Sequence, residues 1–202
     1  MFPPTIMTQS IRITAMALAL VATVCRAEEP TKPVKQEPVA AKDLSKLSKE
    51  ELAKQLDPEA YNVCIMGGTE RPFANKYWDN HEQGLYLDVI SKKPLFASST
   101  KFDSRSGWPA FFNPIDKDEI IEKKDTKIGY VRIEVIAKTS GAHLGHLFDD
   151  GFDYATNKPT PNGKRYCINS AALKFVPLSK LKEEGLEKYA NLFEAVKAPA
   201  KK

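Results

Sequence analysis

Two short runs of the sequence are joined by a long connection rich in turn residues. The runs are residues 143–148 and 165–168, and both are expected to be extended. The turn formers between them are Asp150-Gly151, Pro159, Pro161 and Asn162-Gly163. If the two strands pair through this connection, His143 and His146 of the first run come within reach of Cys167 in the second.

The rest of the folded chain also has the pattern of short strands. Residues 84–90 and 94–96 are strand candidates, since they are short, apolar and rich in β-forming residues. Within residues 130–136, apolar and charged side chains alternate, which predicts a strand with one buried face. A mainly β domain is therefore expected.

Helices are expected near the two ends of this domain. Residues 48–51 fit a capping box, so a short helix should run to about Leu56 and end before Pro58. Between Leu178 and Val196, apolar residues recur at three- and four-residue steps. That spacing predicts an amphipathic helix packed on the sheet.

Composition narrows the classes of protein. The chain has 202 residues, of which 42% are hydrophobic and 28% charged, which suits one globular domain with appendages. Its net charge of +4 is spread over alternating lysine and glutamate rather than one basic face, so no nucleic-acid partner is expected. No coiled-coil seam or long apolar stripe requires a second copy, and we expect a monomer.

The N-terminus has the pattern of an export signal. Arg12 precedes an apolar run over residues 13–24, and Cys25 and Ala27 are the small residues at positions −3 and −1 of a cleavage point after Ala27. The run is shorter than the roughly 20 residues of a transmembrane helix, so no transmembrane segment is expected. A lipid anchor on Cys25 is the competing interpretation, which the preceding valine disfavours. We expect an exported protein, periplasmic or secreted.

The chain is thereby divided into four parts. These are a signal peptide (1–27), a polar, proline-bearing linker expected to be disordered (28–42), the folded domain with flanking helices (43–197) and a basic tail (198–202). Cleavage after Ala27 leaves Cys64 and Cys167 as the cysteines of the mature chain.

Cys167 has the surroundings of a working thiol. The thiolate is the nucleophilic form, and the fixed charge of Arg165 is expected to lower the thiol pKa from its usual value of about 8.5. His143 and His146 can supply a proton. Taken alone, Cys167 could equally be a small buried residue, and the two histidines could be structural or could bind a metal.

Four ordered sequence blocks resemble one protein family. The blocks are residues 68–73, residues 101–104 with 107–109, residues 141–151 and residues 165–170. Together they are similar to the B-type peptide-methionine sulfoxide reductases (MsrB), over residues 61–175. The resemblance implies a mainly β (α+β) fold with two antiparallel sheets, a few peripheral helices and a site on the sheet surface.

The resemblance also implies a chemistry. Cys167 would attack the sulfur of a methionine R-sulfoxide in a peptide or protein, and His146 or His143 would give protons to the oxygen. The products would be methionine and a sulfenic acid on Cys167. In this family the residues matching Arg165 and Asn169 help set the thiolate and bind substrate. Trp108 matches the aromatic residue that packs against the substrate methyl group.

Two departures from the family pattern are visible. Many relatives hold a structural zinc with two Cys-x-x-Cys pairs, which are absent here in residues 86–91 and 137–140. We therefore expect no zinc and no other cofactor. A common form of the family has its resolving cysteine at the position of Ser106, and serine cannot form a disulfide. Cys64 is then the candidate resolving thiol, with a thioredoxin-like protein reopening the Cys64–Cys167 disulfide.

Other interpretations stay open at this point. An exported binding module could keep the fold and lose catalysis, and a Cys-His hydrolase would also need a thiol and a base. Thr69, Glu70 and Asp149 are expected to organise loops and histidine tautomers. His81 is expected at the surface.

Overall fold

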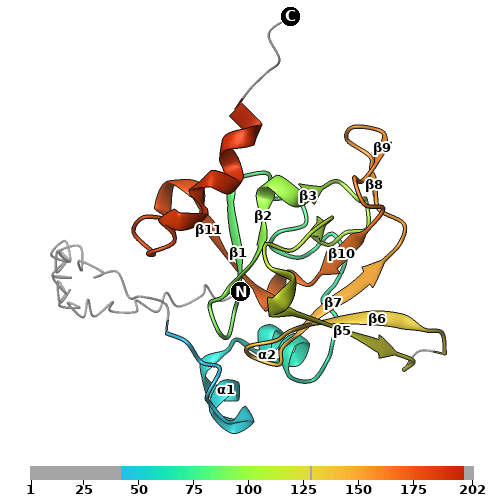
Figure 1. The fold of residues 1–202 in the computed structure, drawn as a ribbon. Helices are drawn as coiled ribbons and strands as arrows, with labels where there is room; N and C mark the ends of the chain where they lie inside the picture. Colours follow the sequence, from blue (N-terminus) through green and yellow to red (C-terminus); the bar gives the residue numbers. More distant parts are fainter. Residues whose placement is uncertain (1–41, 128, 198–202) are drawn as a thin grey trace, which may run out of the picture. The chain divides into compact units, whose positions relative to one another are not determined.

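The structure, a computed structural model, describes residues 42–127 and 129–197 (Figure 1). The predicted signal peptide, all of the predicted linker except Lys42, and the basic tail lie outside the described residues. Within the described ranges, no helix is both long enough and apolar enough to cross a membrane.

Most of the regular structure is β (Figure 1). The α-helices and strands are α1 (Lys49–Gln55), α2 (Pro58–Cys64), β1 (Gly84–Asp88), β2 (Pro94–Ala97), β3 (Lys101–Phe102), β4 (Ala110–Phe111), β5 (Ile120–Asp125), β6 (Arg132–Ala137), β7 (His143–Phe148), β8 (Phe152–Asp153), β9 (Lys158–Pro159), β10 (Arg165–Ile168) and β11 (Leu173–Pro177). The 3₁₀ helices are η1 (Ser98–Thr100), η2 (Lys117–Glu119), η3 (Ser170–Ala172), η4 (Leu178–Lys180) and η5 (Glu187–Lys197).

The strands form antiparallel sheets, which confirms the predicted fold class. One sheet has three strands in the order β11-β1-β2, and the larger has six in the order β3-β4-β10-β7-β6-β5. These correspond to the two sheets expected from the family resemblance. A separate two-stranded ribbon, β8-β9, lies in the connection between β7 and β10.

The predicted pairing of the two short runs is present and sets the geometry of the site. In the β7–β10 pair, Cys167 is opposite His146 and Tyr166 is opposite Leu147. Side chains alternate between the two faces of a strand. Tyr166 and Leu147 are buried in the core, so Cys167 and His146 lie together on the other face of the sheet.

An aromatic core lies between the two larger sheets. Phe96 of β2 stacks on Phe111 of β4 with ring centroids 4.6 Å apart, and Tyr86 of β1 meets Phe111 edge to face at 5.0 Å. Tyr166 of β10 also packs on Phe96. Each such buried aromatic side chain contributes about 1.5–3 kcal/mol. The strand that carries Cys167 is therefore held from behind by rigid packing.

The two N-terminal helices show one prediction confirmed and one element missed. Helix α1 begins after Ser48 with the predicted capping box, in which Ser48 and Glu51 bond to each other's backbone N–H. The prediction that Pro58 only follows a helix was incomplete. Asp57 caps a second helix, α2, and Pro58 occupies its first turn, where a missing N–H costs nothing.

The predicted C-terminal amphipathic helix has a different form. Its residues make the separate 3₁₀ helices η4 and η5, because Gly185 between them has a φ of 67° that no helix continues through. The predicted packing is nevertheless present. Leu181 and Phe193 are buried against Leu85 and Val176 of the three-stranded sheet.

Candidate active site

Cys167 opens into a small cavity on the outer face of the six-stranded sheet. The cavity has a volume of about 110 Å³ and is lined by Thr69, Trp108, Arg132, Gly145, His146, Phe148, Cys167 and Asn169. Four of the predicted site residues, Cys167, His146, Trp108 and Asn169, are thus brought together. Arg165 and His143 do not line this cavity.

Gly145 lies between the two histidines at a position where no side chain fits. A Cβ atom at this position would lie 2.1 Å from the carbonyl oxygen of Cys167 on the neighbouring strand. Real non-bonded atoms do not approach so closely. Only glycine allows β7 and β10 to pair at this register, and that register places His146 beside Cys167.

The Cys167 thiol is more shielded than the sequence suggested. Burial raises its pKa, and the Ser106 hydroxyl, 3.7 Å from Sγ, and the Arg165 guanidinium only partly offset that effect. The negative charge of Asp150 also raises the pKa of Cys167. The expected net lowering of the thiol pKa was therefore wrong, because a neighbouring charge is readable in sequence and desolvation is not.

Arg165 is engaged with protein groups. Its guanidinium donates two hydrogen bonds to the Asp150 carboxylate, of 2.8 and 2.9 Å, and lies over the Phe148 ring at 4.2 Å from the centroid. The pair holds the Asp150 pKa below its ordinary value. Arg165 therefore influences Cys167 by its charge from beside the cavity.

His146 is held by a carboxylate that the sequence interpretation missed. Its Nε2 lies 2.9 Å from Oδ2 of Asp125, at the end of β5. The same oxygen accepts a 2.7 Å bond from Arg132, and Oδ1 accepts the backbone N–H of Lys127. The bond from Lys127, then those from His146 and Arg132, keep the Asp125 pKa far below its usual range. Asp125 is thus a charged anchor for His146.

His143 forms a second, more buried pair. Its Nδ1 lies 2.7 Å from Oε1 of Glu134, and burial lowers the pKa of the imidazole. Its Nε2 is buried and has no hydrogen-bond partner within the described part of the chain. The two imidazole rings lie 5.4 Å apart, centroid to centroid. Burial therefore favours the neutral form of His143, whose ring packs edge to face against that of His146.

Asn169 and Glu70 clamp the loops around the cavity. Asn169 donates to the Leu144 carbonyl oxygen at 2.9 Å and accepts the backbone N–H of Glu70 at 3.1 Å. The buried Glu70 carboxylate accepts backbone N–H groups of the segment after β10, including that of Ala171 at 2.8 Å. The Glu70 carbonyl oxygen accepts the Trp108 indole N–H at 3.2 Å. Glu70 therefore organises a loop, as the sequence suggested.

Cys64 lies away from this cavity, at the end of α2. Its side chain belongs to the core, with 3% of the residue exposed, and burial raises the thiol pKa strongly. Both Cys64 and Cys167 are free thiols. Ser106 occupies the place beside Cys167 that the resemblance assigned to a resolving cysteine.

The turns that carry zinc ligands in many relatives are joined here by a carboxylate. Glu119 accepts a 2.7 Å bond from Thr139 in the β6–β7 turn and a 3.4 Å bond from Lys93 before β2. Asp88 is buried and binds the N–H groups of its own turn at Ile90 and Ser91. This oxygen-only set does not fit the four-thiolate zinc site of those relatives. In the described ranges, no group of three or more His, Cys, Asp or Glu side chains could hold a metal ion.

A comparison with known protein families supports this assignment of the site. The family model of the SelR domain matches residues 56–177, which is more than half of the chain. The matched segment begins just before α2 and ends with β11, so it contains every residue of the cavity around Cys167.

Proposed function

The chain belongs to the SelR family of MsrB-type peptide-methionine (R)-S-oxide reductases, and from this premise we propose that Cys167 is the thiol that attacks the sulfoxide. The family reduces methionine R-sulfoxide to methionine at the expense of a thiol. The observation that supports Cys167 is its position opposite His146 on the outer face of the sheet, inside one cavity with Trp108.

The proposed first step balances without an external reductant. The Cys167 thiol supplies two electrons to the sulfoxide sulfur, and the oxygen ends on the cysteine. Methionine and a sulfenic acid on Cys167 are the products, so the cysteine is oxidised and the sulfoxide is reduced. The oxygen needs a proton while its bond to the methionine sulfur breaks, and a positioned acid lowers that barrier.

His146 is the proposed proton carrier. Because burial raises the pKa of Cys167, the thiolate has to be made in place by a neighbouring base. His146 Nε2 faces Asp125, so Nδ1 is the nitrogen that remains to take the thiol proton and pass it to the sulfoxide oxygen. The Asp125 carboxylate holds the proton on Nε2 and thereby keeps Nδ1 as an acceptor.

Trp108 and Asn169 are proposed to shape the binding cavity. The Trp108 indole N–H is anchored on the Glu70 carbonyl oxygen, so its ring is held in place as a wall for the methyl group bonded to the substrate sulfur. The Asn169 amide already forms hydrogen bonds with the backbone of Leu144 and Glu70. Its proposed contribution is to fix the cavity wall, and its effect on the thiolate is indirect.

Recycling is proposed to use Cys64 and a thioredoxin-like donor. The sulfenic acid on Cys167 would condense with the Cys64 thiol to give a disulfide and water, and a dithiol would then reduce that disulfide by exchange. The support is that Ser106 cannot resolve the sulfenic acid and that Cys64 is the other free thiol of the described chain.

Assays with resolved epimers test the proposed function. The protein with dithiothreitol should reduce the R epimer of a methionine sulfoxide peptide and leave the S epimer unchanged. Cys167→Ser should abolish the reaction, because a serine alkoxide does not form at neutral pH without a stronger base. Turnover of both epimers at equal rates, or ester hydrolysis in place of reduction, would show the proposal to be wrong.

A further inference from the structure

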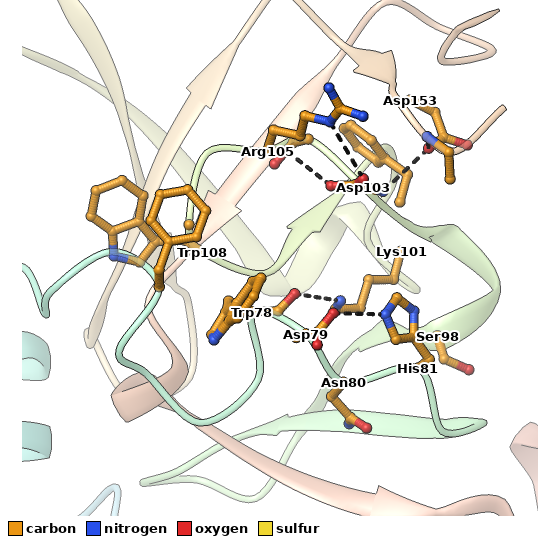
Figure 2. A pocket seen from close by; sticks show the side chains of 15 residues that line it. Trp78, Asp79, Asn80, His81, Ser98, Lys101, Asp103, Arg105, Trp108 and Asp153 are labelled. Carbon is orange, nitrogen blue, oxygen red and sulfur yellow. Dashed lines mark hydrogen bonds and ion pairs between the residues drawn. The ribbon is translucent and has the colours of Figure 1, made fainter. Parts of the chain in front are cut away.

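A second, larger cavity adjoins the catalytic one. It has a volume of about 420 Å³, and its walls include Phe73, Trp78, Lys101, Arg105 and Trp108 (Figure 2). Trp108 lines both cavities, so they lie on either side of one residue. This cavity is called the flanking pocket below.

One side of the flanking pocket is aromatic. Phe73 and Trp78 meet edge to face with centroids 5.4 Å apart, yet Phe73 is 54% exposed and Trp78 is 38% exposed. Figure 2 shows Trp78 on the same side of the pocket as Trp108. An exposed aromatic pair beside a reactive thiol offers a contact surface for an apolar group.

The backbone of this wall is held in unusual conformations. Phe73 and Arg105 both have positive φ angles, 57° and 51°, in the left-handed region that disfavours residues with a side chain. The Phe73 N–H donates to the Gly107 carbonyl oxygen at 2.8 Å, and Asn75 Nδ2 donates to the same oxygen at 2.7 Å. Strain that the surrounding structure maintains concentrates at binding sites. The wall is therefore already formed when a ligand arrives.

The opposite side of the flanking pocket is polar and carries charges of both signs. Lys101 donates to the Trp78 carbonyl oxygen at 3.1 Å, and Asp79 bonds His81 at 2.9 Å (Figure 2). The Arg105 Nε atom lies 3.9 Å from Oδ2 of Asp103. Because lysine and arginine are balanced by aspartates, the pocket does not select for an anion. Its donors and acceptors suit the amide groups of a peptide chain.

We propose that the flanking pocket binds the neighbour of the oxidised methionine in a peptide substrate, with an aromatic or large apolar side chain against Trp78 and Phe73. This inference rests on the proposed function, in which the methionine sulfoxide itself occupies the cavity of Cys167. A peptide that continues past Trp108 enters the flanking pocket directly, because the two cavities share that wall.

The test compares small substrates that differ only beside the methionine. N-acetyl-methionine-R-sulfoxide amide is the minimal substrate, and phenylalanine or glycine is added on either side of the methionine. With dithiothreitol as reductant, phenylalanine at one of the two positions should raise kcat/KM about tenfold over glycine. Trp78→Ala should remove that gain and leave the minimal substrate unaffected, whereas Trp78→Phe should retain most of it.

Ile121→Ala is the matched control, because Ile121 is 42% exposed and lines neither cavity. The proposal is overturned if phenylalanine and glycine peptides react equally well, or if Trp78→Ala slows all substrates alike. The proposal would also be overturned if Trp78→Ala lowered the activity with thioredoxin as reductant and left the activity with dithiothreitol unchanged. The pocket would then receive the reductant. Failure of the proposed function would differ, because wild-type protein would not reduce the minimal substrate.

Discussion

Replacing Asp125 by asparagine should slow methionine sulfoxide reduction by about 10²-fold with little change in KM. Asp125 does not line the cavity of Cys167, yet it bonds the ring nitrogen of His146 that faces away from the reaction. The substitution keeps the size of the side chain and removes its charge. A group that acts only on proton transfer should change kcat and leave substrate binding nearly intact.

The magnitude follows from the three donors that Asp125 serves. One oxygen accepts from His146 and Arg132, and the other accepts from the Lys127 backbone N–H. An asparagine amide has only one oxygen, so either orientation turns its NH₂ group toward a donor. His146 would then face either the NH₂ group or an uncharged oxygen, so its tautomer would be held less firmly while the ring remains in the cavity. The loss should therefore fall at the lower end of the 10²–10⁴ range for removing a positioned acid or base.

A double-mutant cycle with His146→Ala decides whether Asp125 acts through His146. The single variant His146→Ala should lose about 10²–10⁴ in kcat, and adding Asp125→Asn should cost nothing more, because residues that act as a unit are not additive. Asp118→Asn, an exposed aspartate of η2, serves as the control. If the losses of the two single variants multiplied in the double variant, Asp125 would not be a positioning residue for His146.

Three further predictions concern the thiol, the second histidine and the metal. Alkylation of Cys167 by iodoacetamide should rise with pH through a pKa above the usual 8.5, and Arg165→Gln should move that pKa higher still. A titration centred below roughly pH 8 would contradict the dominance of burial. His143→Ala should lower kcat less than His146→Ala, because His143 lies outside the catalytic cavity, and steady-state kinetics with an equal or larger loss would reverse the two roles. Elemental analysis should find no stoichiometric zinc, and a chelator should leave Tm unchanged, whereas a tightly bound equivalent of zinc would contradict this expectation.

The pairing that makes the site was predictable because its signals are local. Two short extended runs and the turn residues between them are enough to suggest neighbouring strands, and the strand pairing then places Cys167 opposite His146. Gly145 is required by the same strand pair, since a side chain there would strike the neighbouring strand. Residues that share one strand pair can therefore be assigned to one site from the amino-acid sequence.

The charged network behind the site depends on contacts that no local pattern records. Asp125 stands among lysines in the sequence and resembles a surface residue, although it is buried and bonds His146, 21 positions further on. Only the order β5-β6-β7 brings the two together. The raised pKa of Cys167 has the same origin, because desolvation is a property of the packed site.

Helix ends gave mixed results for a related reason. The bonds of the capping box at Ser48 lie within four residues, so the start of α1 was predicted correctly. Asp57 and Pro58 carried an equally local signal for α2, since aspartate is a frequent helix cap and proline a frequent first residue. Proline also frequently follows the end of a helix, so Pro58 alone does not distinguish the end of α1 from the start of α2.

Cys64 has to move if it is the resolving thiol, because a resolving thiol has to reach Cys167. A disulfide needs the two Cα atoms within about 7 Å. Cys64 ends α2 inside the core, but Thr69, which lines the catalytic cavity, is only five positions further along the chain. Five extended residues span at most about 17 Å. Release of this segment alone could therefore bring Cys64 to the site, while the sheets stay intact.

We accordingly expect disulfide formation to depend on the stability of α2. Reduced protein given substrate and no reductant should form one Cys64–Cys167 disulfide, detectable by peptide mass mapping. Cys64→Ser should complete one turnover and stall with a thioredoxin-like donor. Asp57→Ala removes the side chain that caps α2, which costs about 0.5–2 kcal/mol, so it should speed disulfide formation by up to roughly thirtyfold. Full thioredoxin-supported cycling by Cys64→Ser would mean that the donor attacks the sulfenic acid directly and that Cys64 is a core residue only.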